Sequence, residues 1–90
     1  MKNRNIFYSE VFLKRTENIP QEIIDLVVKK EQIFEKSPLH PSLRTHPLKG
    51  RLKGYWSLSI NKQYRIIFQY KENGDILFLS IGKHDIYRSI

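Results

Sequence analysis

The chain has 90 residues, no cysteine, and 16 Lys and Arg against 9 Asp and Glu, which leaves a formal net charge of +7. This length predicts a single domain over residues 1–90, and a hydrophobic content of 40% argues against wholesale disorder. The lack of cysteine excludes disulfides, a thiolate nucleophile and a cysteine metal site, which fits a reducing cytoplasm. The positive charge favours polyanions as partners, the alternative being a basic surface that serves solubility.

The first predicted elements are a short strand and a short helix. Ile6–Tyr8 is rich in β-forming residues, and Ser9 is a good N-cap for a helix that runs to about Thr16. The apolar residues after the basic N-terminus are interrupted by Ser9, Glu10 and Lys14. We therefore expect no signal peptide and no membrane span there.

A second, amphipathic helix is predicted to follow and to end before Pro38. Asn18 and Gln21 resemble a capping box, and Pro20 suits the first helical turn. The apolar face of this helix consists of residues at helical spacing: Ile23, Leu26, Val27, Ile33 and Phe34.

Residues 37–54 are predicted to form one long loop, because they contain a high density of helix and strand breakers: Pro38, Pro41, Pro47, Gly50 and Gly54. A loop of this length in a compact domain is more often functional or mobile than a mere connection. It carries His40 and His46. Its cationic side chains have no acidic residue among them: Arg44, Lys49, Arg51 and Lys53.

The remaining residues predict three antiparallel strands. Trp56–Ile60 alternates apolar and polar residues. Tyr64–Lys71 also alternates, with Arg65 on the more polar side of the strand. Ile76–Ile81 is apolar on both faces, as in a central strand. Asn73–Asp75 is a strong hairpin signal. We expect an α+β fold in which two N-terminal helices pack on a small antiparallel sheet of about four strands.

The sheet face away from the helices is the candidate site. It would display Ser57, Ser59 and Arg65, with His46 arriving from the loop and His84 from the strand end. RNA can be cut without a metal, because its 2′-hydroxyl attacks the adjacent phosphorus when a base removes its proton and an acid protonates the leaving oxygen. An imidazole, with a pKa of about 6.5, suits either role, and a guanidinium neutralises phosphoryl oxygens through paired hydrogen bonds. These residues therefore suggest RNA cleavage without a cofactor.

Each of these residues also has a structural reading. His46 precedes a proline and could be a surface turn residue, His84 could cap the strand or pair with Asp85, and Arg65 could form a salt bridge. A metal site built from His46, His84 and Asp85 is a weak alternative, because it offers one carboxylate and no helical ligand spacing. We expect His40 to be structural.

Two further assignments concern side chains around the site. The cations of the loop are candidate contacts for the phosphate backbone, with a solvated loop as the alternative, and Lys83 is given the same role: Lys49, Arg51, Lys53 and Lys83. Trp56 alternates with Leu58 and Ile60, so we assign it to packing and not to base stacking.

The order and spacing of several motifs resemble the RelE/ParE superfamily of bacterial toxins, with YoeB-like and YafQ-like mRNA interferases as the most similar subgroups. The fold resemblance covers nearly the whole chain, and the motifs that carry it lie in the second half: Leu48–Gly50, Gly54–Ser57, Tyr64–Phe68, Gly82–His84 and Tyr87.

The resemblance implies a toxin that enters the ribosomal A site, cleaves mRNA there and is held inactive by a cognate antitoxin. His46 matches the proposed general base, Arg65 the arginine that binds the scissile phosphate, and His84 the proposed general acid. Tyr87 resembles the terminal aromatic residue that positions the substrate. A homodimer is left open by the resemblance.

The chain also departs from these subgroups. It has Ser59 where YafQ-like toxins carry a second histidine, Gln63 where they carry an aspartate, and Ser57 and Ser59 where RelE-like toxins carry lysines. Two other functions therefore stay open. One is a ParE-like inhibitor of DNA gyrase without nuclease activity, and the other is an inactive toxin fold that only binds its antitoxin.

Overall fold

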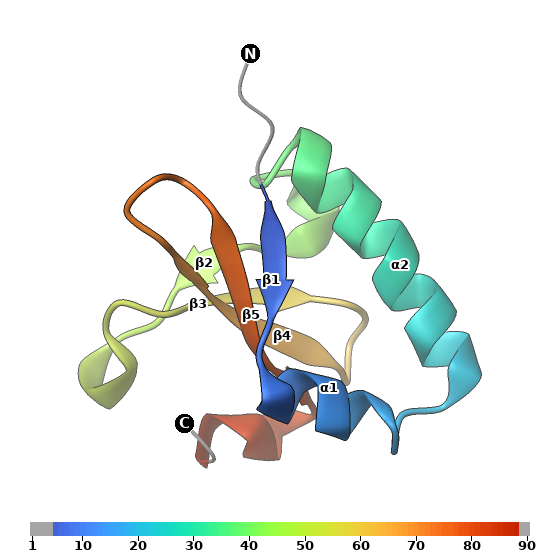
Figure 1. The fold of residues 1–90 in the computed structure, drawn as a ribbon. Helices are drawn as coiled ribbons and strands as arrows, with labels where there is room; N and C mark the ends of the chain where they lie inside the picture. The colour runs from blue at the N-terminus through green and yellow to red at the C-terminus, as the bar shows by residue number, and fades with distance from the viewer. Residues whose placement is uncertain (1–4, 89–90) are drawn as a thin grey trace.

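The computed structural model describes residues 5–88. Two helices lie on one face of a five-stranded sheet with strand order β1-β5-β4-β3-β2 (Figure 1). The elements are β1 Ile6–Tyr8, α1 Glu10–Thr16, α2 Gln21–Lys36, β2 His46–Pro47, β3 Trp56–Ser59, β4 Arg65–Tyr70 and β5 Ile76–Gly82, with 3-10 helices η1 Pro41–Leu43, η2 Gly50–Leu52 and η3 His84–Arg88. The predicted α+β class and both N-terminal helices are confirmed. Within residues 5–88, no helix is long and apolar enough to cross a membrane.

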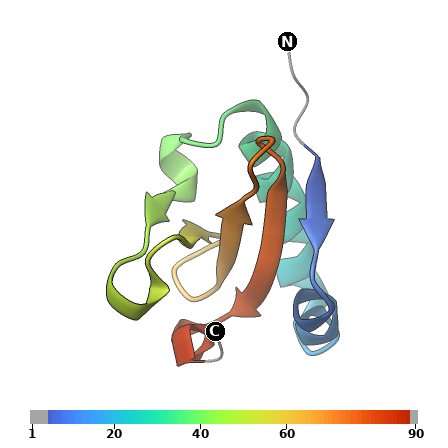
Figure 2. The ribbon, with the colours of Figure 1, turned by 60° about the vertical axis from the view of Figure 1, so that its left-hand side comes forward.

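The sheet differs from the expected antiparallel sheet of about four strands in two respects. First, β1 runs parallel to β5, with Ile6 opposite Ile76, because the whole chain between them serves as the crossover that a parallel pair requires. Second, the long loop contributes β2, which pairs with β3 and places His46 opposite Ser57. Figure 2 shows β1 and β2 at the two edges of the sheet. An edge strand tolerates Pro47, which has no N–H to donate.

Aromatic side chains form the centre of the core between the sheet and α2. The Phe34 ring lies 5.0 Å from the Phe68 ring and 5.9 Å from the Phe78 ring, centroid to centroid, and all three side chains are fully buried. Trp56 is half-buried and packs edge-on against Tyr70 at 5.3 Å. Its assignment to packing is confirmed.

A bulge in β5 lets this strand serve both the core and the start of α1. Phe68 lies opposite Phe78, whereas Ile67 lies opposite Ser80, so Leu79 is an extra residue without a partner in β4. The Leu79 carbonyl instead accepts a hydrogen bond of 2.7 Å from the Ser9 hydroxyl.

The two predicted helix starts have different outcomes. The Ser9 hydroxyl oxygen accepts a bond from the Phe12 N–H at 3.0 Å, which confirms Ser9 as the N-cap of α1. The capping box predicted for α2 is wrong, because Pro20 occupies the N-cap position and offers no side-chain cap. The Gln21 amide instead bonds to Asp25 one turn along the helix, at 2.9 Å.

Candidate active site

The face of the sheet opposite the helices carries one row of residues that runs across four strands. His46, Ser57, Ile67 and Ser80 are successive partners in the ladders from β2 to β5. Directly opposed residues in antiparallel strands have their side chains on the same face. Arg65 belongs to the next row, between Ser59 and Gly82, and so shares this face.

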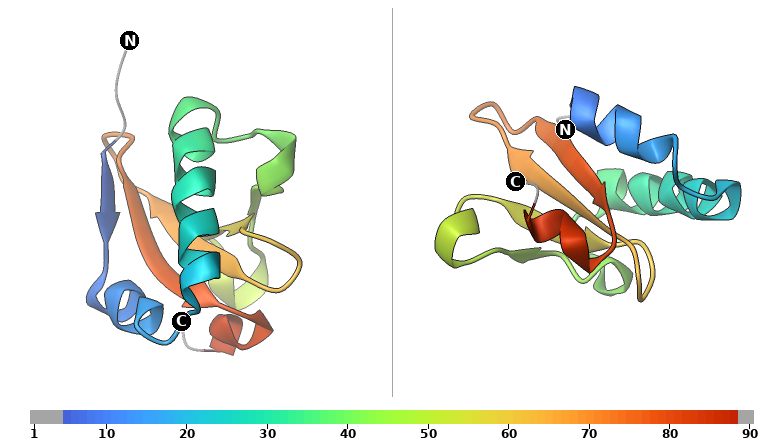
Figure 3. Two further views of the ribbon diagram at one scale, coloured as in Figure 1. Left: turned by 90° about the vertical axis from the view of Figure 1, so that its right-hand side faces the viewer. Right: turned by 90° about the horizontal axis from the view of Figure 1, so that it is seen from below.

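The C-terminal helix η3 covers part of this face. Figure 3 (right) shows η3 on the side of the sheet away from α1 and α2. Its Ile86 is fully buried, and it can pack this closely because Gly82 has no side chain: a Cβ there would lie 2.3 Å from the Ile86 Cγ2. Ser57 and Ser59 are therefore buried, at 0% and 6% exposure, and not displayed to solvent as expected.

His46 is exposed, and its ring is oriented by a backbone carbonyl. The Nδ1 atom lies 2.9 Å from the carbonyl oxygen of Arg44, a residue in the left-handed conformation with φ of 49°. Because a carbonyl can only accept, Nδ1 must carry the proton of this hydrogen bond. In the neutral ring, Nε2 is then the nitrogen with the free lone pair. The geometry therefore gives His46 the tautomer that a general base needs at Nε2.

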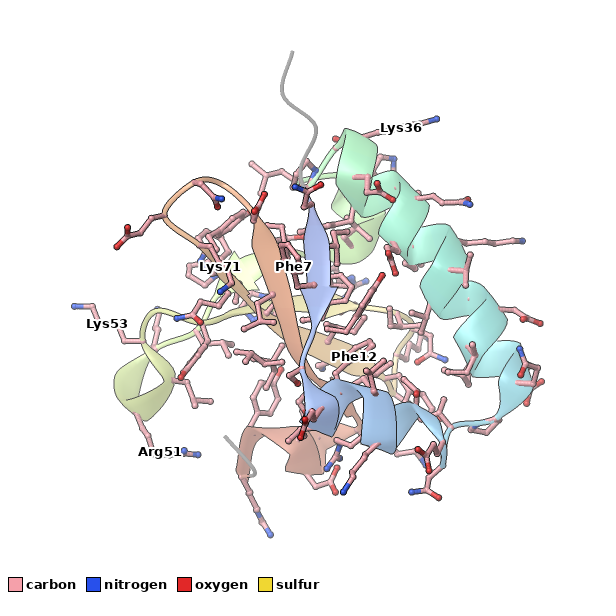
Figure 4. The ribbon with its side chains drawn as sticks, in the orientation of Figure 1. Phe7, Phe12, Lys36, Arg51, Lys53 and Lys71 are labelled. Carbon is pink, nitrogen blue, oxygen red and sulfur yellow. The ribbon has the colours of Figure 1, made fainter. Side chains whose placement is uncertain are left out.

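Tyr87 reaches the same part of the sheet from η3. Its hydroxyl lies 3.3 Å from the Ser57 hydroxyl, and Ser57 is the residue opposite His46. The Tyr87 carbonyl accepts a hydrogen bond of 2.6 Å from the Arg51 guanidinium, which joins η2 to η3. In Figure 4, Arg51 extends from η2 on the side of η3, whereas Lys53 extends away from it.

Arg65 is half-buried and is held by a neutral partner. Its Nη1 donates to the Ser59 hydroxyl at 2.8 Å, and within residues 5–88 the guanidinium pairs with no carboxylate. The structure therefore gives no support to a salt bridge as the role of Arg65. A bond to a hydroxyl leaves the positive charge of the guanidinium available to an anion.

The other predicted residues lie around this centre. His84 is exposed in the first turn of η3, and no hydrogen bond joins it to His46 or Arg65 in the described part of the chain. The Lys83 ammonium lies 5.5 Å from the centre of the Tyr64 ring, on the side of the core. Lys49 and Lys53 are exposed at the two ends of η2.

The structure gives His40 a local role at η1. His40 caps η1, because its Nδ1 accepts from the Ser42 N–H at 3.1 Å, so its structural assignment is confirmed. Among the described residues, no three His, Cys, Asp or Glu side chains are grouped as metal ligands.

Sequence reasoning missed the groups that hold the site together. The bonds from His46 to Arg44 and from Arg51 to Tyr87 both end on a backbone carbonyl, and such an acceptor leaves no residue pattern to find. Ser57 and Ser59 were placed on this face, but the bond from Arg65 to Ser59 was not predicted, although a hydroxyl opposite a lone strand arginine is a natural partner for it.

Comparison with known proteins agrees with this fold. Residues 5–84 match the family described as the RelE-like toxin of the type II toxin-antitoxin system HigB. Toxin HigB-1 of Vibrio cholerae is 38% identical over an alignment of 63 residues, with coverage of 63% of this chain and 66% of that protein, just under two thirds of its length. The endoribonuclease HigB of Proteus vulgaris is 31% identical over an alignment of 70 residues, with coverage of 72% of this chain and 75% of that protein.

A solved structure shows the same fold at lower sequence identity. The YoeB/ParE toxin from Agrobacterium tumefaciens superposes with a TM-score of 0.74 at 15% identity, over 89% of this chain and 98% of that one. The resemblance to the RelE/ParE superfamily is thus confirmed. Because the family match extends over most of the sequence, the chain belongs to the HigB-like family of RelE-like toxins of type II toxin-antitoxin systems.

Proposed function

We propose that this toxin is an endoribonuclease that cleaves mRNA on the ribosome, without a metal, by attack of the RNA 2′-hydroxyl. The observation that carries the proposal is the bond between His46 Nδ1 and the Arg44 carbonyl, which leaves Nε2 free to accept a proton. Further support comes from the name of the Proteus vulgaris relative, which is an endoribonuclease. The cytoplasm, where ribosomes translate mRNA, is the corresponding location.

The proposed reaction uses the residues of the site in two proton transfers. His46 Nε2 takes the proton of the 2′-hydroxyl, whose oxygen then attacks phosphorus. Arg65 neutralises the charge that gathers on the non-bridging oxygens. The bond to the 5′-oxygen breaks as His84 gives it a proton, so the products are a 2′,3′-cyclic phosphate and a 5′-hydroxyl. His84 begins η3 two residues after Gly82, the ladder partner of Arg65, and its exposed side chain is accessible to a substrate.

The remaining predicted residues serve substrate positioning and control. Tyr87, fixed against Ser57, positions the substrate beside His46. Lys49 and Lys53, exposed on either side of η2, contact backbone phosphates. A cognate antitoxin holds the toxin inactive, as the type II description of the family suggests.

The test is a cleavage assay with purified toxin, ribosomes and a defined mRNA, in which cleaved ends are mapped by primer extension. We expect His46→Ala to lower the cleavage rate by roughly 10²- to 10⁴-fold, the usual contribution of a positioned base. His40→Ala is the matched control, because it removes an imidazole that caps η1 and should cleave like the wild type. Equal cleavage by His46→Ala, or inhibition of gyrase supercoiling with intact mRNA, would contradict the proposal.

A further inference from the structure

A second basic site lies beside the candidate active site, in a groove of about 260 Å³ at the end of β3. Four cationic side chains line it, each from a different segment: Lys30 of α2, Arg44 after η1, Lys62 of the β3–β4 turn and Arg65 of β4. Figure 3 (left) shows η1 and the β3–β4 turn on the same side of α2. No carboxylate is among the described residues that line this groove.

The polar groups in the groove are arranged to donate. The Asn61 carbonyl oxygen already accepts from the N–H groups of Gln63 and Tyr64, at 2.8 and 2.7 Å. Its NH₂ group is therefore the part of this side chain that can serve a ligand. Amide and ammonium donors without an acidic neighbour fit an anion. Lysine and arginine side chains together form charge-assisted hydrogen bonds to a phosphate or a carboxylate.

Two residues join this groove to the candidate active site. Arg65 lines the groove and is also the arginine proposed to bind the scissile phosphate. Arg44 also lines the groove, and its carbonyl oxygen accepts the hydrogen bond from His46 Nδ1. A ligand in the groove would therefore lie next to the phosphodiester on which His46 acts.

We propose that this groove binds the backbone phosphate next to the scissile one in the single-stranded RNA substrate, with Lys30, Arg44 and Lys62 as the residues that hold it. This inference rests on the proposed function and adds a binding site to it. RNA is favoured over an acidic peptide because Arg65 and Arg44 belong to the groove and also to the candidate active site, so successive phosphates of one strand would occupy both.

The test is the affinity of the full-length toxin for a single-stranded RNA whose 2′-hydroxyls are methylated, so that binding is measured without cleavage. Fluorescence anisotropy at several salt concentrations would compare the wild type with Lys30→Gln/Lys62→Gln. The matched control is Lys29→Gln/Lys71→Gln, which removes the same charge from exposed lysines that do not line the groove. Circular dichroism would verify that each variant is folded.

We expect the groove variant to bind roughly tenfold more weakly than the control variant. The slope of log affinity against log salt concentration should become shallower by about 0.7 for each phosphate that the variant no longer neutralises. Lys30→Arg/Lys62→Arg should keep the wild-type affinity, because it keeps both charges. Equal RNA affinity of the groove and control variants would overturn the inference, as would a loss of antitoxin binding with RNA binding unchanged, or no RNA binding by the wild type.

The two proposals can fail separately. If the wild type never cleaves ribosome-bound mRNA but the groove variant loses RNA affinity, the groove stands as an RNA site and the nuclease proposal falls. If cleavage depends on His46 while the groove variant binds RNA like the control, the nuclease proposal stands and the groove inference falls.

Discussion

At the scale of single residues, the proposed chemistry depends on side chains whose orientation comes from backbone and hydroxyl groups. The Arg44 carbonyl sets the His46 tautomer, and the Ser59 hydroxyl holds the Arg65 guanidinium. Neither the carbonyl nor the hydroxyl is charged, so neither neutralises the positive charge that would bind a phosphate. A lysine in place of Arg65 could not bond to Ser59 and to a phosphate with the same planar geometry.

Arg51 has two possible roles, because the sequence suggests a contact to a backbone phosphate and the structure shows a bond to η3. Its bond to the Tyr87 carbonyl indicates that it positions η3. We therefore expect Arg51→Gln to lower kcat by roughly tenfold with little change in KM, since it loosens the helix that carries Tyr87 and His84. Single-turnover and steady-state cleavage assays measure the two parameters.

The matched control for this prediction is Lys53→Gln, which removes a charge at the other end of η2, where the side chain extends away from η3 (Figure 4). This variant should raise KM and leave kcat unchanged, as expected for a residue that binds a backbone phosphate. If Arg51→Gln behaves like Lys53→Gln, the two residues share one role and the positioning role of Arg51 is wrong.

The residues of the site were predictable to different extents. His46 and Arg65 stand out in the sequence because each has an unusual neighbourhood, a proline-rich loop and an apolar strand. The grouping of His46, Ser57 and Tyr87 depends on the register of β2 and on η3, so no local pattern contains it. Lys83 illustrates the limit, since its sequence position next to His84 did not reveal that it packs over Tyr64.

At the scale of elements, the start of α1 and the bulge of β5 stabilise each other through Ser9. The Ser9 hydroxyl caps the Phe12 N–H and donates to the Leu79 carbonyl, so one side chain satisfies a helix end and the unpaired residue of the bulge. The same residue joins α1 to the sheet, because its N–H donates to the Phe78 carbonyl at 3.0 Å.

We expect Ser9→Ala to destabilise the fold. Loss of the N-cap and of the bond to Leu79 should lower the free energy of unfolding by about 1–2 kcal/mol, the usual cost of removing a serine cap together with a second partly buried bond. Urea unfolding followed by circular dichroism measures it. Ser37→Ala is the control, because Ser37 is exposed at the end of α2 and bonds there through its backbone N–H. Equal stability of both variants would contradict this account.

Helices and strands were predicted correctly where the apolar residues recur at the spacing of a helix or a strand. β3 and β4 alternate, and α2 has a clear apolar face, so all three were found. β2 has two residues, too few to show a period, and its pairing depends on the position of the long loop. The parallel direction of β1 also has no local signal, because it depends on where the chain returns after residues 9–75.

At the scale of the whole molecule, one face of the sheet packs on the helices and the other carries the candidate site. One face is buried against the helices by a cluster of phenylalanines and supplies the packing. The other carries the row from His46 to Ser80, and the groove of Lys30, Arg44 and Lys62 shares Arg65 with this face. The net charge of +7 was visible in the sequence, but the groove joins four separated segments and was not.

In the proposed reaction the 2′-hydroxyl of the RNA is the attacking group and His46 removes its proton. The most direct test is single-turnover cleavage of ribosome-bound mRNA that carries a 2′-deoxy nucleotide only at the mapped cleavage position. The account predicts no cleavage at that position, and 2′,3′-cyclic phosphate ends on the unmodified message that disappear with His46→Ala. Cleavage of the deoxy message at the normal rate, or products with 3′-hydroxyl ends, would contradict it.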